Sequence, residues 1–346
     1  MSLTHRVLGT AAGAAGLAAA GAAVGVARRR RSIARRDSDG TEFGSLRAPA
    51  RTLVAADGVP LHLEVDEPEQ RRSDVTVVFC HGYALNLDCW HFQRQACRRA
   101  GIRAVFYDQR SHGRSGRSSL ENATIEQLAV DLAQLLDEAV PDGPVVLVGH
   151  SMGGMTVVAL AEEHPELFGD RVVGVGLIGT TAGGLDPSRL LLPVLPAKLG
   201  GGIAHGAVRT LARSHRTVDG LRRLGRTVAT VATDVFAFGG PVPPAYVDFV
   251  DDMLSATPFE VVAEFFPSFR GLDKFDAVEV LGKVPTTVVC GTADRLTSIG
   301  HSRKLHSRIS GSRLLEVEGS GHMVMIESHD EVDAALAELY DAAGSR

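Results

Sequence analysis

The segment Gly149-His150-Ser151-Met152-Gly153 constrains the fold of this chain more than any other stretch. It has the G-x-S-x-G pattern, in which a serine occupies a sharp turn between a strand and a helix. An apolar run at 145–148 precedes the motif, and residues 154–164 have the pattern of a helix. Glycines two residues before and after the serine leave the room that this strained turn needs. The sequence therefore predicts a nucleophile elbow that lifts Ser151 above a sheet.

Two downstream loops contain candidate partners for this serine. Asp294 and His322 each follow a short apolar run that is typical of a strand. A serine hydroxyl is a weak nucleophile at neutral pH, so it needs an adjacent base, and an imidazole can take its proton. A carboxylate can then hold the imidazole tautomer and stabilise the imidazolium. We therefore predict a triad of Ser151, Asp294 and His322, with Asp273 and Asp276 as the alternatives for the acid.

A fourth motif, His81-Gly82-Tyr83, follows the apolar run 75–80. Acyl transfer needs two backbone N–H groups directed at the oxygen on which negative charge develops. One is expected from Met152, the residue directly after the nucleophile, and the other from Tyr83. The sequence thus predicts an oxyanion hole formed by the backbone N–H groups of Tyr83 and Met152.

Together these motifs resemble those of the α/β-hydrolase superfamily, in its branch of serine esterases and monoglyceride lipases. The resemblance spans about residues 50 to 340, and its matching segments are 81–82, 108–115, 149–154, 291–294 and 319–322. It implies the α/β-hydrolase fold, with a helical cap inserted before the triad acid, and it implies neither a cofactor nor a metal. The segment after the acid departs from the family, which often has a proline where this chain has Arg295-Leu296-Thr297-Ser298.

The order of predicted elements agrees with an α/β fold. A hairpin is expected where residues 51–56 and 61–65 flank Asp57-Gly58. Strands at 75–80, 102–107, 145–149, 172–178, 286–290 and 313–317 then alternate with helices at 87–100, 124–139, 298–309 and 323–342. This alternation is typical of a mostly parallel, twisted sheet with helices on both faces.

Residues 181–275 interrupt the alternation. They are rich in prolines with interleaved leucines and phenylalanines, and they lie where the superfamily inserts its cap. We expect some of these apolar side chains to line a ligand pocket. The predicted division is therefore a core of residues 51–180 and 276–346 and a helical cap of residues 181–275.

The N-terminus differs from the rest of the chain. Residues 7–27 carry no charge and are long enough to cross a bilayer once. Six arginines follow within residues 28–36, and the positive-inside rule then places the catalytic domain in the cytoplasm. We expect residues 1–36 to anchor the protein to membrane lipids and residues 37–50 to form a linker, so that removal of 1–36 leaves the enzyme intact. A cleaved export signal and a peripheral tail are the alternatives.

Charge and cysteine content narrow the partners and the compartment. Residues 1–36 contain seven arginines and no acid, whereas the remainder has 29 basic and 41 acidic residues. An acidic catalytic domain argues against a nucleic-acid partner. The four cysteines lack the spacing of a disulfide framework, so free thiols in a reducing compartment are expected.

The identity of the nucleophile narrows the chemistry. Dehalogenases and epoxide hydrolases of the superfamily carry aspartate at the elbow, where this chain has Ser151. A serine with a histidine base favours hydrolysis of a small-molecule carboxylic ester through an acyl-enzyme. The apolar cap and the N-terminal segment favour a lipid-like acyl ester and a lipase or carboxylesterase. The alternatives are a carbon–carbon bond hydrolase, a cofactor-free perhydrolase, a thioesterase and a non-catalytic ligand-binding member of the fold.

Overall fold

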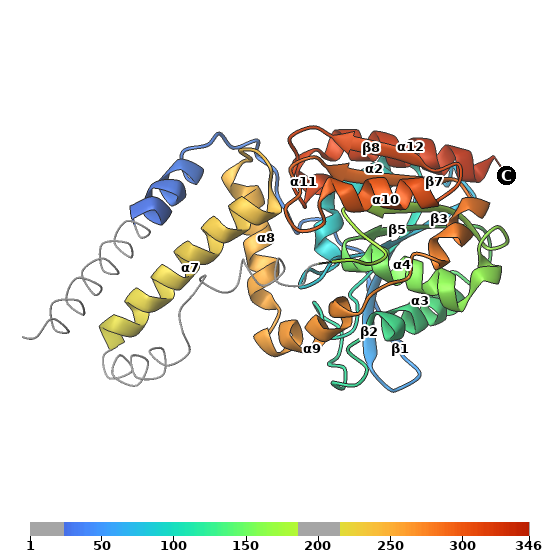
Figure 1. Cartoon of the computed structure of the whole chain (residues 1–346), viewed down its shortest axis with the longest axis horizontal. Coiled ribbons are helices and arrows are strands. Elements are labelled where there is room, and N and C mark those ends of the chain that lie inside the picture. Colours follow the sequence, from blue (N-terminus) through green and yellow to red (C-terminus); the bar gives the residue numbers. More distant parts are fainter. Residues whose placement is uncertain (1–23, 186–214, 346) are drawn as a thin grey trace, which may run out of the picture.

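The computed structural model describes residues 24–185 and 215–345 of the chain, except for the side chains of 215–224 and 226 (Figure 1). Most of the apolar segment 7–27 therefore lies outside the described residues, as does the part of the predicted cap at 186–214. Within the described ranges, no helix combines the length and the apolar character that a membrane crossing requires.

An 8-stranded sheet with the order β1-β2-β4-β3-β5-β6-β7-β8 forms the centre of the molecule. β1 (Ala50–Val54) and β2 (Pro60–Asp66) form the predicted hairpin, and β2 also runs antiparallel to β4 (Arg103–Tyr107). Every pairing from β4 onward is parallel. The remaining strands are β3 (Thr76–Cys80), β5 (Val145–His150), β6 (Val172–Ile178), β7 (Thr286–Gly291) and β8 (Arg313–Val317). The prediction of a mostly parallel sheet is confirmed.

Helices cover both faces of this sheet because successive strand side chains point to opposite sides. In β3, Val78 packs in a core with α3 (Ile125–Ala139) and α4 (Met152–Glu163). Its neighbour Phe79 packs in a second core with α2 (His91–Ala100) and α12 (His329–Gly344). Figure 1 shows these two pairs of helices on opposite sides of the strands. The other helices of this part are α10 (Ile299–Arg308), α11 (Val324–Glu327) and the 3-10 turns Leu87–Trp90, Pro165–Leu167 and Ala277–Lys283.

Among the described residues, three helices follow β6 in the interval for which the sequence predicts a cap. They are α7 (His215–Ala237), α8 (Pro244–Ala256) and α9 (Phe259–Arg270). α8 begins with a proline in its first turn, and α9 directly follows Pro258, where a missing N–H and a fixed φ fit a helix start. α7 projects away from the sheet, whereas α9 lies close to it, near β1 and β2 in this view (Figure 1).

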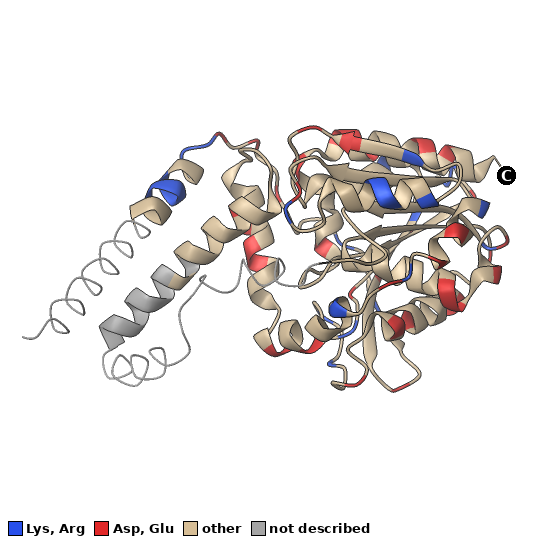
Figure 2. Cartoon of the chain, in the orientation of Figure 1, with Lys and Arg blue, Asp and Glu red and all other residues tan. Residues whose placement is uncertain are grey.

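The described end of the N-terminal segment packs against these helices. Helix 24–33 lies beside α7 (Figure 1), and its arginine run forms a band of positive charge (Figure 2). Arg29 and Arg36 both bind the carboxylate of Asp234 on α7, at N–O distances of 2.7 and 2.5 Å. The Asp234 side chain has 0% exposure. The arginines expected to face lipid therefore include two counter-ions of a buried carboxylate.

Residues 37–50 are more than a spacer between two parts of the chain. The Phe43 ring stacks on Phe249 of α8 with a centroid distance of 4.2 Å. The Tyr246 hydroxyl, also on α8, donates a hydrogen bond of 2.6 Å to Asp39. Through these contacts the predicted linker packs on α8.

The four cysteines occupy the interior of the sheet and of the layer around α2. Cys80, Cys89, Cys97 and Cys290 are all free and all buried. The prediction of free thiols is confirmed.

Candidate active site

The elbow has the strained geometry that its sequence predicts. Ser151 lies between the end of β5 and the start of α4 with φ 51° and ψ −115°, a conformation that is rare for a residue with a side chain. Its N–H donates to the carbonyl of Ile178 on β6 at 2.9 Å. A Cβ added to Gly153 would lie 2.0 Å from the Cys80 carbonyl oxygen, and one added to Gly149 would lie 2.5 Å from the Gly153 oxygen. Both glycines are therefore required by close backbone approach.

The loops after β7 and β8 bring the candidate acid and base together. The Nδ1 atom of His322 lies 2.9 Å from Oδ2 of Asp294. The Oδ1 atom of Asp294 accepts hydrogen bonds from the backbone N–H groups of Leu296 at 2.8 Å and Thr297 at 2.9 Å. The carboxylate is buried and held from two sides, so it can orient the imidazole. The alternative acids, Asp273 and Asp276, are exposed and make no hydrogen bond with His322.

Thr297 is a member of this site that the sequence analysis did not single out. Its hydroxyl lies 2.8 Å from Oδ2 of Asp294, 2.7 Å from the Gly179 carbonyl oxygen and 3.2 Å from Nδ1 of His322. It occupies the segment in which this chain lacks the family's proline. A hydroxyl residue in the turn directly after the acid is the signal that could have identified it.

Ser151 and His322 are on adjoining loops, although no hydrogen bond joins their side chains in the described part of the chain. His150 packs its ring 4.7 Å from the ring of His322 and lies with Nε2 3.0 Å from the His322 carbonyl oxygen. On the other side, the Thr180 hydroxyl donates to the Ser151 carbonyl at 2.6 Å. Catalytic hydrogen bonds often form only once substrate binds, so a serine–histidine pair does not require this bond in the free protein.

The residues predicted to form the oxyanion hole lie at the ends of neighbouring strands. Tyr83 follows β3, and Met152 is the first residue of α4, directly after β5. Neither backbone N–H donates a hydrogen bond to another residue that the structure describes. The Tyr83 side chain instead donates its hydroxyl to the carbonyl of Val262 on α9. The two amides are thus available to an acyl oxygen at the same edge of the sheet.

Three motif histidines stay neutral and shape the surrounding loops. Burial lowers the pKa of His81 to about 3 and that of His112 to about 4. Burial, together with the nearby His322, lowers the pKa of His150 well below its usual value. The His81 ring accepts from the backbone N–H of Gln109 at 2.9 Å, which ties the loop after β3 to the loop after β4.

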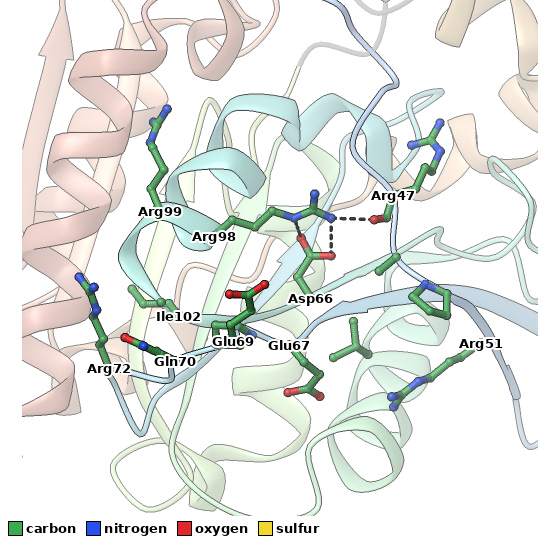
Figure 3. A pocket seen from close by; sticks show the side chains of 15 residues that line it. Arg47, Arg51, Asp66, Glu67, Glu69, Gln70, Arg72, Arg98, Arg99 and Ile102 are labelled. Atoms are coloured by element: carbon green, nitrogen blue, oxygen red, sulfur yellow. Dashed lines mark hydrogen bonds and ion pairs between the residues drawn. The ribbon is translucent and has the colours of Figure 1, made fainter.

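A groove of about 870 Å³ opens far from these residues (Figure 3). Its lining includes Arg98, Arg99, Gly101 and Ile102, before β4, whereas Ser151 lies beyond the carboxyl ends of the parallel strands. Figure 3 shows that Arg98 binds Asp66, with its Nε atom 2.6 Å from the carboxylate. Among the described residues, no group of three metal-binding side chains is close enough to hold an ion.

Comparison with known proteins agrees with this geometry. The family model described as alpha/beta hydrolase fold matches residues 75–329. A monoacylglycerol lipase from Mycolicibacterium smegmatis is 26% identical over 75% of this chain and 84% of its own length. A proline iminopeptidase from Saccharolobus solfataricus is 24% identical over 70% of this chain and 76% of its own.

The solved structure of an esterase from Exiguobacterium antarcticum has the same fold. It superposes with a TM-score of 0.64 at 20% identity, over 85% of this chain and all of the esterase. The matched region contains the elbow, the acid, the base and the loop after β3. The chain therefore belongs to the alpha/beta hydrolase fold family, in its esterase- and lipase-like branch.

Proposed function

We propose that this protein is a serine hydrolase that cleaves carboxylic esters through an acyl-enzyme intermediate. One observation carries the proposal: a serine in a strained elbow conformation adjoins a buried histidine that binds a buried carboxylate at 2.9 Å. A positive φ at a residue with a side chain costs free energy, and such strain concentrates at functional sites.

In the proposed mechanism, Nε2 of His322 takes the proton of the Ser151 hydroxyl as the oxygen attacks the ester carbonyl. The backbone N–H groups of Tyr83 and Met152 stabilise the oxyanion of the tetrahedral intermediate. His322 then returns the proton to the departing alcohol, which leaves an acyl group on Ser151. A water molecule activated by His322 attacks this acyl group and releases the acid, while Asp294 stabilises the imidazolium in both halves.

We propose an apolar acyl group for the substrate. α9 packs against the loop that carries the proposed oxyanion hole, because the Phe269 ring lies 4.9 Å from Tyr83 and the Phe265 ring lies 5.3 Å from His112. Both phenylalanines are buried, so the cap packs on this loop through an apolar layer, and an apolar surround is typical of small-molecule sites. The similarity to a monoacylglycerol lipase supports the same substrate class.

A panel of p-nitrophenyl esters from acetate to palmitate tests this proposal on the full chain in detergent. We expect turnover of these esters, with kcat/KM rising from acetyl to medium-chain acyl groups. A proline p-nitroanilide and an acyl thioester in the same panel test the amide and thioester alternatives. If no ester turns over while one of these does, the proposed ester specificity is wrong.

We further propose that residues 1–36 contact membrane lipids, with the catalytic domain on the cytoplasmic side. The apolar segment 7–27 and its flanking arginines support this proposal. In helix 24–33 and the turn after it, Arg28, Arg31 and Arg35 are exposed, and their spacing places them on a different side of the helix from Arg29 and Arg36. This second set of arginines is placed to meet anionic headgroups while the first set holds Asp234.

A further inference from the structure

Glu327 makes an unusual set of hydrogen bonds next to the candidate base. It is the last residue of α11, five positions after His322, and within the described part of the chain its carboxylate accepts hydrogen bonds from backbone N–H groups alone. Oε2 accepts from Gly321 at 2.7 Å and from Gly239 at 3.0 Å, and Oε1 accepts from Gly240 at 2.8 Å. One side chain therefore holds two segments that lie about eighty residues apart in the sequence.

The two segments are residues 237–240, at the end of α7, and residues 319–323, which we call the histidine loop. Their backbones are in direct contact, because a Cβ added to Gly239 would lie 2.0 Å from the Gly319 carbonyl oxygen. A Cβ added to Gly321 would lie 2.5 Å from the Gly239 nitrogen. The N–H of Met323 also donates to the Ala237 carbonyl at 2.8 Å. A displacement of one segment must therefore displace the other.

The Glu327 carboxylate suits the contact between residues 237–240 and the histidine loop. Neither the 237–240 segment nor the histidine loop is in a helix or strand beyond Ala237, so their N–H groups need an acceptor from elsewhere. Three converging donors form a small concave site that favours a negative charge. An oxygen with a full charge binds such donors more strongly than a neutral amide does.

We propose that Glu327 is a positioning residue, which holds the histidine loop in place for catalysis and couples His322 to the end of α7. This inference rests on the proposed role of His322. Glu327 fixes Gly321, the residue before His322, on one side and the end of the cap helix on the other. The placement of the imidazole relative to Ser151 therefore depends on where α7 lies.

Substitution of Glu327 tests the proposal with kinetics. In Glu327→Ala we expect kcat to fall on the order of 10- to 100-fold, as a displacement of about 1 Å does elsewhere, with KM within about threefold. Glu327→Gln retains one acceptor oxygen and should lose less. Glu331→Gln, an exposed residue in the first turn of α12, is the matched control and should keep the parental kcat. Rates are taken per folded molecule, with the folded fraction measured by circular dichroism.

Hydrogen exchange gives a readout that does not depend on ester turnover. Peptides covering 237–241 and 318–324 should both exchange faster in Glu327→Ala and Glu327→Gln than in the parent, and both should be unchanged in Glu331→Gln. Ser151→Ala should leave both peptides unchanged, so a failure of the proposed chemistry is distinguishable from a failure of the coupling. The proposal is wrong if kcat per folded molecule is unaffected, or if the two peptides do not change together.

Discussion

At the scale of single residues, the strained conformation of Ser151 follows from the sequence around it. Gly149 and Gly153 permit backbone contacts that no other residue would allow, and they are visible in the motif itself. The contact of Asp294 with His322 was also predictable, because each residue lies in a loop after a strand and the carboxyl ends of parallel strands share one edge of the sheet. Thr297 and Glu327 were not, because their partners come from distant segments such as Gly179 and Gly239. A hydroxyl in a turn, or a carboxylate at the end of a short helix, has no periodicity that indicates such contacts.

The acid assignment leads to a first prediction at this scale. Asp294→Asn should lower kcat about 10³- to 10⁴-fold, because an amide can stabilise the wrong imidazole tautomer and cannot support the imidazolium. Asp273→Asn and Asp276→Asn should retain most activity, since both residues are exposed and do not contact His322. Steady-state kinetics on a single ester compare the three variants. A dead Asp276→Asn variant beside an active Asp294→Asn variant would place the acid elsewhere.

A second residue-scale prediction concerns pH. Burial raises the pKa of Asp333 to about 6, and its carboxylate accepts a hydrogen bond of 2.9 Å from Nε2 of Gln93. A folded-state pKa above the unfolded value means that the ionised carboxylate costs stability above pH 6. This cost disappears as the pH falls from about 6 to about 4, where both states are protonated.

Asp333→Asn should therefore raise the melting temperature at pH 7.5, by an amount equivalent to about 1–2 kcal/mol. The gain should shrink toward zero at about pH 4, because the asparagine oxygen keeps the bond from Gln93 and no charge is left to remove. Thermal unfolding of parent and variant across this pH range measures the difference. A variant that is less stable than the parent at pH 7.5 would show that burial of the charge is not costly.

At the scale of elements, most strands and helices of the core were predictable because hydrophobic periodicity determines them. The strands predicted at 75–80 and 313–317 agree closely with β3 and β8. The helix predicted at 87–100 is divided, because Asn86 caps a separate 3-10 turn, Leu87–Trp90, before α2 begins. The packing of helix 24–33 on α7 was not predictable, since an arginine run gives no sign of a buried partner such as Asp234.

The Asp234 contact leads to an element-scale prediction. Removal of residues 1–36 takes away both arginines that bind this buried carboxylate, so the truncated protein should melt at least about 5 °C lower. Removal of residues 1–23 alone keeps helix 24–33 and should leave the melting temperature unchanged. Differential scanning calorimetry of the two truncations measures the effect.

The control for this prediction is Asp234→Asn, whose effect on stability should change sign between the two proteins. Asp234→Asn should destabilise the longer protein, because it breaks two ion pairs, and should stabilise the protein that lacks 1–36, because it removes an unpaired charge. If the substitution has the same effect in both backgrounds, the ion pairs do not join helix 24–33 to α7.

At the scale of the whole molecule, contacts connect the N-terminal segment to the candidate active site through the cap. Arg29 and Arg36 hold α7 through Asp234, and the end of α7 meets the histidine loop through Glu327. These contacts join the cap to the N-terminal segment, which we propose lies at a membrane. The candidate active site would then lie near a lipid surface. The overall charge division, with arginines at one end and an acidic core, was readable from the sequence alone.

The proposed membrane contact makes a prediction for the full chain. Membrane fractions should retain the protein through a wash in ~1 M salt, where the Debye length of about 3 Å screens exposed arginines. Retention would then depend on burial of the apolar segment 7–27 rather than on charge. Protease added to intact cells should leave the catalytic domain uncut. A mature chain that begins near residue 28 and occurs in the medium would instead identify an export signal.

Covalent labelling of Ser151 tests the central claim most directly. A fluorophosphonate reacts with a serine that a neighbouring base activates, and peptide mass spectrometry then locates the adduct. We predict a single adduct on Ser151, its absence in Ser151→Ala, and a parallel loss of ester turnover on the order of a million-fold. Ser307→Ala, at an exposed serine on α10, should label and turn over like the parent. An adduct on another serine, with full ester turnover in Ser151→Ala, would contradict the account.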